Sequence, residues 1–213
     1  MTQQDLRSTR REYSGELLRN QLKLDPVEQF KGWMEEALEF PVTDATAMAL
    51  ATADGSGQPS VRMVLLKHYG AEGFCWYTDK RSPSGQELLK NARAELLFYW
   101  QVFNRQVRIS GRVEALADDL NEEYFSQRPE ACQFSASASH QSDIVENRGK
   151  LESAIEALHL RYPDGSAPRP EQWGGYALIP DSFEFWQGRE SRLHDRFRYR
   201  RQAQQWVIER LAP

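Results

Sequence analysis

Residues 47–78, AMALATADGSGQPSVRMVLLKHYGAEGFCWYT, decide the expected fold of this chain. Ala47–Ala53 is short and apolar, as a strand is, and it leads into the turn signal DGSG at residues 54–57. A second apolar segment follows at residues 59–67, so the two segments together predict a β-hairpin. Residues 73–78 predict a third strand soon after it.

Outside this stretch, strands and helices do not alternate regularly. Further strands are predicted at residues 94–100, 106–117, 175–187, 196–201 and 206–211. Helices are predicted from Asp25-Pro26 to just before Pro41, over 85–91, from Asp118 toward Arg128, and over 146–162. The small and polar residues 133–142 predict a loop. This pattern favours a mainly β fold with α insertions, a β-barrel, over a doubly wound sheet.

The length and composition suit one globular domain. The chain has 213 residues, of which 40% are hydrophobic and 27% are charged. We expect residues 25–213 to form a single domain. Residues 1–24 are polar and rich in arginine. They predict either a disordered tail or a flexible arm that closes over an anionic ligand.

Charge and cysteine content exclude several classes of protein. The formal net charge is −4, whereas a general nucleic-acid binder is usually basic. Cys75 and Cys132 make neither a disulfide framework nor a metal site. No apolar run approaches the roughly 20 residues that cross a bilayer, and the first residues lack the apolar stretch of a signal peptide. We therefore expect a cytoplasmic protein without a membrane contact.

The segment RMVLLK, residues 62–67, has a cation at each end of an apolar run. It is either an amphipathic strand with exposed ends, or Arg62 meets a phosphate and Lys67 a second polar group. Strand alternation puts these two positions on opposite faces. They can serve one site only if the strand bends or if Lys67 lies past its end. No glycine-rich phosphate loop is present, so a nucleotide-like cofactor would be held by cationic side chains.

A second polar segment lies near the C-terminus. In an extended chain Trp186, Arg192, His194 and Arg196 would share one face. An aromatic ring, two guanidinium groups and an imidazole on one face could hold an aromatic anion. The alternative is a surface strand with cross-strand charge pairs.

A third segment is YFSQRP, residues 124–129. Tyr124 and Arg128 are four residues apart, so they share a helix face. A hydroxyl and a guanidinium at a helix end suit a phosphate, and a solvent-exposed pair fits the spacing equally well.

Taken together, these segments give the chain a resemblance to the pyridoxamine 5′-phosphate oxidase family in its bacterial form. The similarity runs from RREY at residues 10–13 to RLAP at residues 210–213. Other matching segments are YT at 77–78, RQV at 105–107, QS at 141–142, WGG at 173–175, EFWQG at 184–188 and RLHDR at 192–196.

The resemblance implies an FMN-binding split β-barrel that forms a homodimer with FMN at the interface. It implies an oxidase that converts the phosphorylated B6 vitamers, pyridoxamine and pyridoxine 5′-phosphate, to pyridoxal 5′-phosphate, with oxygen as acceptor and hydrogen peroxide as product. Two alternatives are a related flavin oxidase acting on another aromatic compound, and a non-catalytic module that binds FMN or pyridoxal phosphate.

The resemblance also implies residue roles. The FMN contacts would be Arg62, Met63, Val64, Lys67, Tyr77, Thr78, Ser84, Gln106, Gln141, Ser142, Trp186 and Arg196. The substrate contacts would be Arg10, Tyr13, Lys67, Tyr124, Arg128, Cys132, Arg192 and His194. Of these, Arg192 and His194 would orient the substrate and assist proton transfer as catalytic residues.

The chain departs from the family pattern in the expected FMN-phosphate loop. Pro83 and Ser84 stand where the family usually has arginine and lysine. Losing one charge-assisted phosphate contact weakens binding by about tenfold to a hundredfold, although Lys80 or Arg81 could compensate. Cys132 stands where the family generally has a serine, and residues 135–138, SASA, stand where many relatives have Gly-Ala-Trp.

Overall fold

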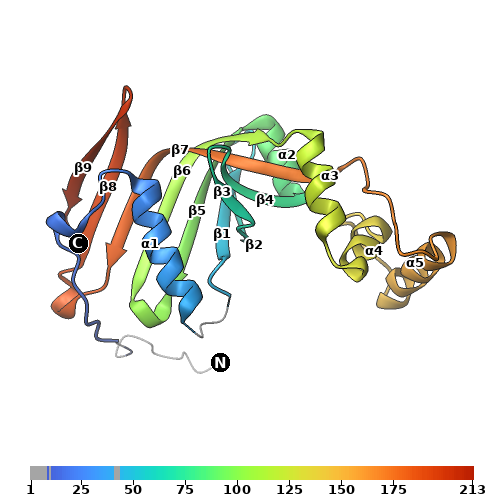
Figure 1. The fold of residues 1–213 in the computed structure, drawn as a ribbon, viewed down its shortest axis with the longest axis horizontal. Helices are drawn as coiled ribbons and strands as arrows, with labels where there is room; N and C mark the ends of the chain where they lie inside the picture. Colours follow the sequence, from blue (N-terminus) through green and yellow to red (C-terminus); the bar gives the residue numbers. More distant parts are fainter. Residues whose placement is uncertain (1–8, 10, 41–43) are drawn as a thin grey trace. The chain divides into compact units, whose positions relative to one another are not determined.

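The computed structural model describes residue 9, residues 11–40 and residues 44–213 (Figure 1). Its strands are β1 (Ala47–Ala53), β2 (Pro59–Leu65), β3 (His68–Gly70), β4 (Gly73–Asp79), β5 (Arg93–Trp100), β6 (Arg105–Ala115), β7 (Trp173–Gln187), β8 (Asp195–Gln202) and β9 (Gln205–Leu211). Its α-helices are α1 (Pro26–Glu39), α2 (Pro83–Lys90), α3 (Asp118–Gln127), α4 (Glu130–Ala138) and α5 (Arg148–Arg161). Short 3₁₀ turns lie at Arg19–Gln21, Gln101–Phe103 and Glu190–Arg192.

The hydrogen-bonded strand order is β2-β1-β5-β6-β7-β4-β3, with β8 paired to β7 and β9 paired to β8. The expected hairpin of β1 and β2 is confirmed, because the strands are neighbours and the side chain of Asp54 closes the turn. Its Oδ1 accepts from the backbone nitrogen atoms of Ser56 at 2.8 Å and Gln58 at 3.0 Å. The mainly β class with helical insertions is therefore confirmed.

The chain divides into two compact units. The first holds residues 1–48, 96–109 and 181–213, and the second holds residues 49–95 and 110–180. Strands β5, β6 and β7 each contribute residues to both.

The first unit has an aromatic core formed by α1 and the strands of that unit. Asp25 caps α1 by accepting from the nitrogen of Val27 at 2.9 Å, and Pro26 occupies the first helical position. The buried face of α1 then packs Phe30 against Phe98 and Trp33 against Phe185, with ring centroids 5.0 and 5.3 Å apart. This helix was predicted from its sequence, and the prediction is confirmed.

In the second unit, β4 pairs antiparallel with the first half of β7. The register places Trp76 opposite Tyr176 and Tyr77 opposite Gly175. Every residue of β4 except Tyr77 is buried. Residues of β4 line one cavity together with residues of α3 and α4.

The loop predicted at residues 133–142 is wrong over its first half, because α4 extends to Ala138. Serine and alanine are compatible with a helix when the burial of one large apolar side chain stabilises it. Phe134 supplies that anchor: it is fully buried and its ring stacks on His159 of α5 at 4.0 Å. The helix predicted over 146–162 is confirmed as α5, which buries none of its residues fully and leaves Leu160 81% exposed. No α-helix in the described part of the chain is long and apolar enough to span a membrane.

Candidate active site

The second unit contains a cavity of about 280 Å³ that gathers six of the predicted site residues. These are Lys67, Tyr77, Thr78, Tyr124, Arg128 and Gln141. Lys67 reaches the cavity because β2 ends at Leu65, so that Lys67 lies past the strand rather than within it. Its backbone nitrogen bonds to the carbonyl of Cys75 at 2.9 Å, which fixes the turn into β4.

One wall of the cavity is a stack of three aromatic rings. The ring of Tyr77 lies 4.0 Å from that of Tyr124 and 5.4 Å from that of Trp173. Gly175 makes this closeness possible, because a Cβ atom there would lie 2.8 Å from Tyr77 and 2.5 Å from Leu116. The sequence did not single out Trp173 as a site residue, although it lies in the matching segment WGG.

Arg128 supplies a guanidinium group to the lining of the cavity. Its guanidinium lies 4.7 Å above the ring of Trp173, which fixes its plane through a cation–π contact. Its Nη1 atom is buried and has no hydrogen-bond partner among the described residues. A buried donor without a partner costs free energy. An anionic ligand group in the cavity would remove that cost.

The carboxylate that lines the cavity does not cancel this positive charge. Asp79 forms an ion pair with Arg81 at 2.6 Å. Burial alone would raise the pKa of Asp79, but the hydrogen bonds and charge of Arg81 outweigh it and hold the pKa below its usual range. The charges of Asp79 and Arg81 therefore neutralise each other. Lys67 and Arg128 are the cations of the cavity lining that could bind an anionic ligand.

Thr78 and Gln141 form a polar pair at the edge of the same cavity. The Thr78 hydroxyl donates to Gln141 Oε1 at 2.7 Å, and the backbone nitrogen of Asp79 donates to the same oxygen at 3.1 Å. No hydrogen bond of the Gln141 amide nitrogen is found among the described residues. Ser142 follows with a positive φ of 74° and is exposed.

A second group of predicted residues lies in the first unit. Tyr13, Trp186 and His194 form an aromatic cluster, with Tyr13 edge-on to Trp186 at 5.7 Å and to His194 at 5.6 Å. Arg192 lies over the ring of Tyr13 at 5.9 Å. Gly188 lets Tyr13 approach, since a Cβ atom there would lie 2.8 Å from its ring.

The extended chain assumed for residues 186–196 is wrong. A 3₁₀ turn at Glu190–Arg192 interrupts it, with positive φ angles at Ser191 and Arg192. Trp186 and Arg196 nevertheless meet, because they are directly opposite each other on β7 and β8. The pairing of β7 with β8, rather than alternation along one extended strand, therefore brings Trp186 and Arg196 together.

His194 is oriented by the backbone of this turn. Its Nδ1 accepts a hydrogen bond from the nitrogen of Arg189 at 3.1 Å. Burial, with the charges of Arg192 and Arg196, lowers the pKa of His194 from its ordinary value. The imidazole is therefore neutral near pH 7 and carries its proton on Nε2, which makes Nε2 a hydrogen-bond donor.

The N-terminal segment is tied to this cluster through Asp195. The backbone nitrogen of Leu17 donates to Asp195 Oδ2 at 3.1 Å, and Arg210 donates to Oδ1 at 2.7 Å. Asp195 is 1% exposed. The described part of the predicted arm is therefore ordered against the first unit, while Arg10 lies outside the described residues.

The remaining predicted residues lie elsewhere. Arg62 forms an ion pair with Glu87 at 3.2 Å, Arg196 pairs with Glu184 at 2.8 Å, and Met63 is 65% exposed on β2. Ser84 is buried on α2, Cys132 is exposed on α4, and Val64 and Gln106 are half-buried.

Replacing Arg192 with glutamine is expected to raise the pKa of His194 toward the ordinary imidazole value of about 6.5. The substitution removes one of the two cations that lower it. An NMR titration of the imidazole ring resonances measures this directly, with Arg148→Gln on α5 as a control that removes an equal charge elsewhere. An unchanged pKa would show that Arg192 does not act on the imidazole.

Comparison with known proteins agrees with this geometry. A family model described as pyridoxamine 5′-phosphate oxidase matches residues 34–162, and one described as the pyridoxine 5′-phosphate oxidase C-terminal dimerisation region matches residues 173–213. The chain is 46% identical over 211 residues to the pyridoxine/pyridoxamine 5′-phosphate oxidase of Idiomarina loihiensis, covering 98% of this chain and 100% of the relative. It is 48% identical over 200 residues to that of Bordetella avium, covering 93% and 94%.

Two solved structures have a similar fold. PhzG from Burkholderia lata, crystallised with tetrahydrophenazine-1-carboxylic acid, superposes with a TM-score of 0.88 at 30% identity, covering 94% of this chain and 100% of that one. A pyridoxamine 5′-phosphate oxidase-related FMN-binding protein from Nostoc punctiforme gives a TM-score of 0.73 at 17% identity, covering 90% and 100%. The fold is thus that of the FMN-binding split β-barrel proteins. Within that class, the chain belongs to the pyridoxamine 5′-phosphate oxidase family.

Proposed function

We propose that this protein is an FMN-dependent oxidase that converts pyridoxamine and pyridoxine 5′-phosphate to pyridoxal 5′-phosphate. The observation that carries the proposal is that Arg128, whose buried Nη1 has no partner in the part of the chain that the structure describes, lines a cavity walled by aromatic rings. A planar ring that bears a phosphate suits both features of that cavity, and family membership adds the reaction type.

In the proposed reaction the phosphate of the substrate binds Arg128, Lys67 and the hydroxyl of Tyr124. Burial raises the pKa of the neighbouring Tyr77 to about 12, with smaller contributions from Cys75, Tyr124 and Glu123. Tyr77 therefore stays neutral and serves as a ring surface rather than as a base. The two cations fix the phosphate end, which leaves the reacting carbon at the other end of the ring to be oriented.

We propose that His194 and Arg192, which belong to the first unit, are substrate-orienting residues, as the family resemblance implies. Neutral His194 offers its Nε2 proton to an oxygen of the substrate, and Arg192 adds a positive charge beside it. Tyr13 packs edge-on against the imidazole and limits the access of water.

The residues present fit a bound flavin in part. Gln141 offers its amide nitrogen, and Trp186 and Arg196 lie on adjacent strands. When bound, FMN would supply a two-electron acceptor for the hydride of the substrate carbon; oxygen would then take the two electrons with two protons, one from that carbon and one from the hydroxyl or amine group, to give hydrogen peroxide. With pyridoxine 5′-phosphate the alcohol becomes the aldehyde, and with pyridoxamine 5′-phosphate water also enters and ammonia leaves.

We also propose that the protein is a homodimer with FMN at its interface. The chain carries the C-terminal dimerisation region of its family. Strand β2 presents three apolar side chains outward, Val61, Met63 and Leu65, which are 68%, 65% and 38% exposed. An apolar stripe of this kind suits burial against a second copy.

The proposed function predicts peroxide release when the FMN-loaded protein meets either phosphorylated vitamer under air. An amperometric peroxide assay, with the dephosphorylated vitamers as controls, measures both turnover and the need for the phosphate. Binding of pyridoxal phosphate without turnover would instead favour a non-catalytic module.

A related oxidase that acts on a tricyclic aromatic acid is the second candidate. It is favoured by the likeness to PhzG and by the small side chains of Ser135 and Ala136, which line the cavity. Turnover of such acids without turnover of the vitamers would reverse the order of the two candidates.

A further inference from the structure

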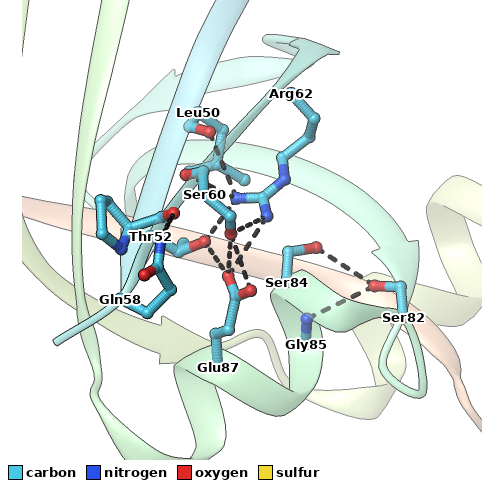
Figure 2. Close-up of polar contacts among 10 residues, drawn as sticks. Leu50, Thr52, Gln58, Ser60, Arg62, Ser82, Ser84, Gly85 and Glu87 are labelled. Carbon is cyan, nitrogen blue, oxygen red and sulfur yellow. Dashed lines mark hydrogen bonds and ion pairs between the residues drawn. The ribbon is translucent and has the colours of Figure 1, made fainter. Parts of the chain in front are cut away.

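The side chain of Arg62 is already engaged within the protein (Figure 2). Its Nη2 donates to Ser60 Oγ at 2.5 Å and to Glu87 Oε2 at 3.2 Å. Its Nη1 donates to Thr52 Oγ1 and to the carbonyl of Leu50, the latter at 3.3 Å. Both terminal nitrogen atoms of the guanidinium that is expected to meet the FMN phosphate therefore have partners, and one of these partners is an anion.

Glu87 is held in its charged form by the same network. Ser60 Oγ donates to Glu87 Oε1 at 2.7 Å, and Thr52 Oγ1 donates to Oε2. Burial alone would raise the pKa of Glu87, but these hydroxyl groups and Arg62 outweigh it and lower the pKa. The Glu87 side chain is 15% exposed and the Arg62 side chain 25% exposed, so water screens the pair only in part.

Glu87 also lies on the helix face that carries the two departures from the family pattern. Position 87 of α2 lies four residues after Pro83 and three residues after Ser84, so Glu87 neighbours both positions on the helix surface. Ser84 is buried, and its hydroxyl lies 3.1 Å from that of Ser82. Where the family pattern has two cations, this face has a proline, a serine and, one turn further, an anion.

The two nearby cations do not restore the missing charge. Arg81 is engaged by Asp79 at 2.6 Å. The Nζ atom of Lys80 lies 3.1 Å from the place that a Cβ atom of Gly174 would occupy, so this side chain extends along β7. Among the described residues beside α2, Arg62 is thus a cation that is already paired with the anion Glu87, and Ser82 and Ser84 add hydroxyl groups.

We propose that Glu87 competes with the flavin phosphate for Arg62, so that this protein binds flavin mainly through its ring system and discriminates only weakly between FMN and riboflavin. The proposal rests on the proposed function in that it takes the flavin to be the cofactor. A phosphate dianion must either displace the carboxylate from Arg62 or bind beside it, and both alternatives weaken its binding. Riboflavin has no phosphate, so it meets neither cost.

Titration of the apoprotein with FMN and with riboflavin, followed by the quenching of flavin fluorescence, tests this. Glu87→Gln keeps the shape of the side chain and removes its charge, so we expect FMN to bind about tenfold to a hundredfold more tightly. Riboflavin binding should change less than about twofold. Glu122→Gln on α3, whose carboxylate pairs with Arg169 at 3.0 Å, removes an equal charge elsewhere and should change neither.

A second variant tests the same subsite from the other side. Ser84→Lys restores a cation at that position and should also tighten FMN but not riboflavin, provided that its thermal unfolding matches the parent protein. If Glu87→Gln leaves FMN binding unchanged or weakens it, Glu87 positions Arg62 for the phosphate and the proposal is wrong while the oxidase function stands. If neither flavin binds the parent protein or the variants, both the proposal and the proposed function fail.

Discussion

Replacing Arg128 with methionine is expected to lower kcat/KM for pyridoxine 5′-phosphate by about a hundredfold, mainly through KM. Arg128 lines the cavity and its buried Nη1 has no partner among the described residues, so under the proposed function a bound phosphate would receive a charge-assisted bond from this guanidinium. Such a bond contributes roughly 1.5–3 kcal/mol. Methionine keeps the length and apolar packing against Trp173 but offers no donor.

The same substitution should leave stability unchanged or raise it. In the absence of ligand, the buried Nη1 has lost water without gaining a partner among the described residues, which costs free energy in the folded state. Steady-state kinetics and thermal unfolding of Arg128→Met, beside the exposed control Arg148→Met, separate the two effects. An unchanged KM with a lowered unfolding temperature would show that Arg128 is structural.

Replacing His194 should have the next largest effect, and its size should depend on which ring nitrogen the new side chain imitates. Nδ1 accepts from the backbone nitrogen of Arg189 at 3.1 Å, so under the proposed function Nε2 would be the ring nitrogen that donates to the substrate. An asparagine imitates Nδ1, whereas a glutamine amide can reach the place of Nε2. We expect His194→Asn to lower kcat/KM by about a hundredfold and His194→Gln to lower it by about tenfold.

The pH dependence of kcat/KM provides an independent check on this assignment. Because the pKa of His194 is lowered, the neutral donor form persists through neutral pH and is lost only below the ordinary imidazole range. The acid limb of the parent protein should flatten in His194→Gln. If asparagine proves the better replacement, or if the acid limb persists, Nε2 is not the group that meets the substrate.

Local sequence signals were sufficient for much of the fold. The turn at Asp54 and the Asp25-Pro26 helix start both depend on neighbouring residues only, and both are confirmed. The helix α4 was missed because its stability comes from the burial of Phe134 and from its contact with His159, which lies far along the chain. A pattern of small polar residues gives no sign of such a contact.

The candidate site shows the same division. The residues of RMVLLK and of Tyr124 to Arg128 could be selected from charge and spacing, and Lys67, Tyr124 and Arg128 do line one cavity. The partner of Arg62 could not be predicted from the sequence. Glu87 belongs to another element, and its ion pair with Arg62 depends on how α2 packs beside β2. Trp173 was also passed over, since a lone tryptophan before two glycines is typical of a core as well as of a ligand wall.

The most direct test of the central claim is to mix the FMN-loaded protein with pyridoxine 5′-phosphate in the absence of oxygen and to follow the visible absorbance of the flavin. The account predicts that the yellow absorbance disappears as about one equivalent of pyridoxal 5′-phosphate forms, and that it returns with hydrogen peroxide when oxygen is admitted. A flavin that stays oxidised in the presence of saturating pyridoxine 5′-phosphate would contradict it.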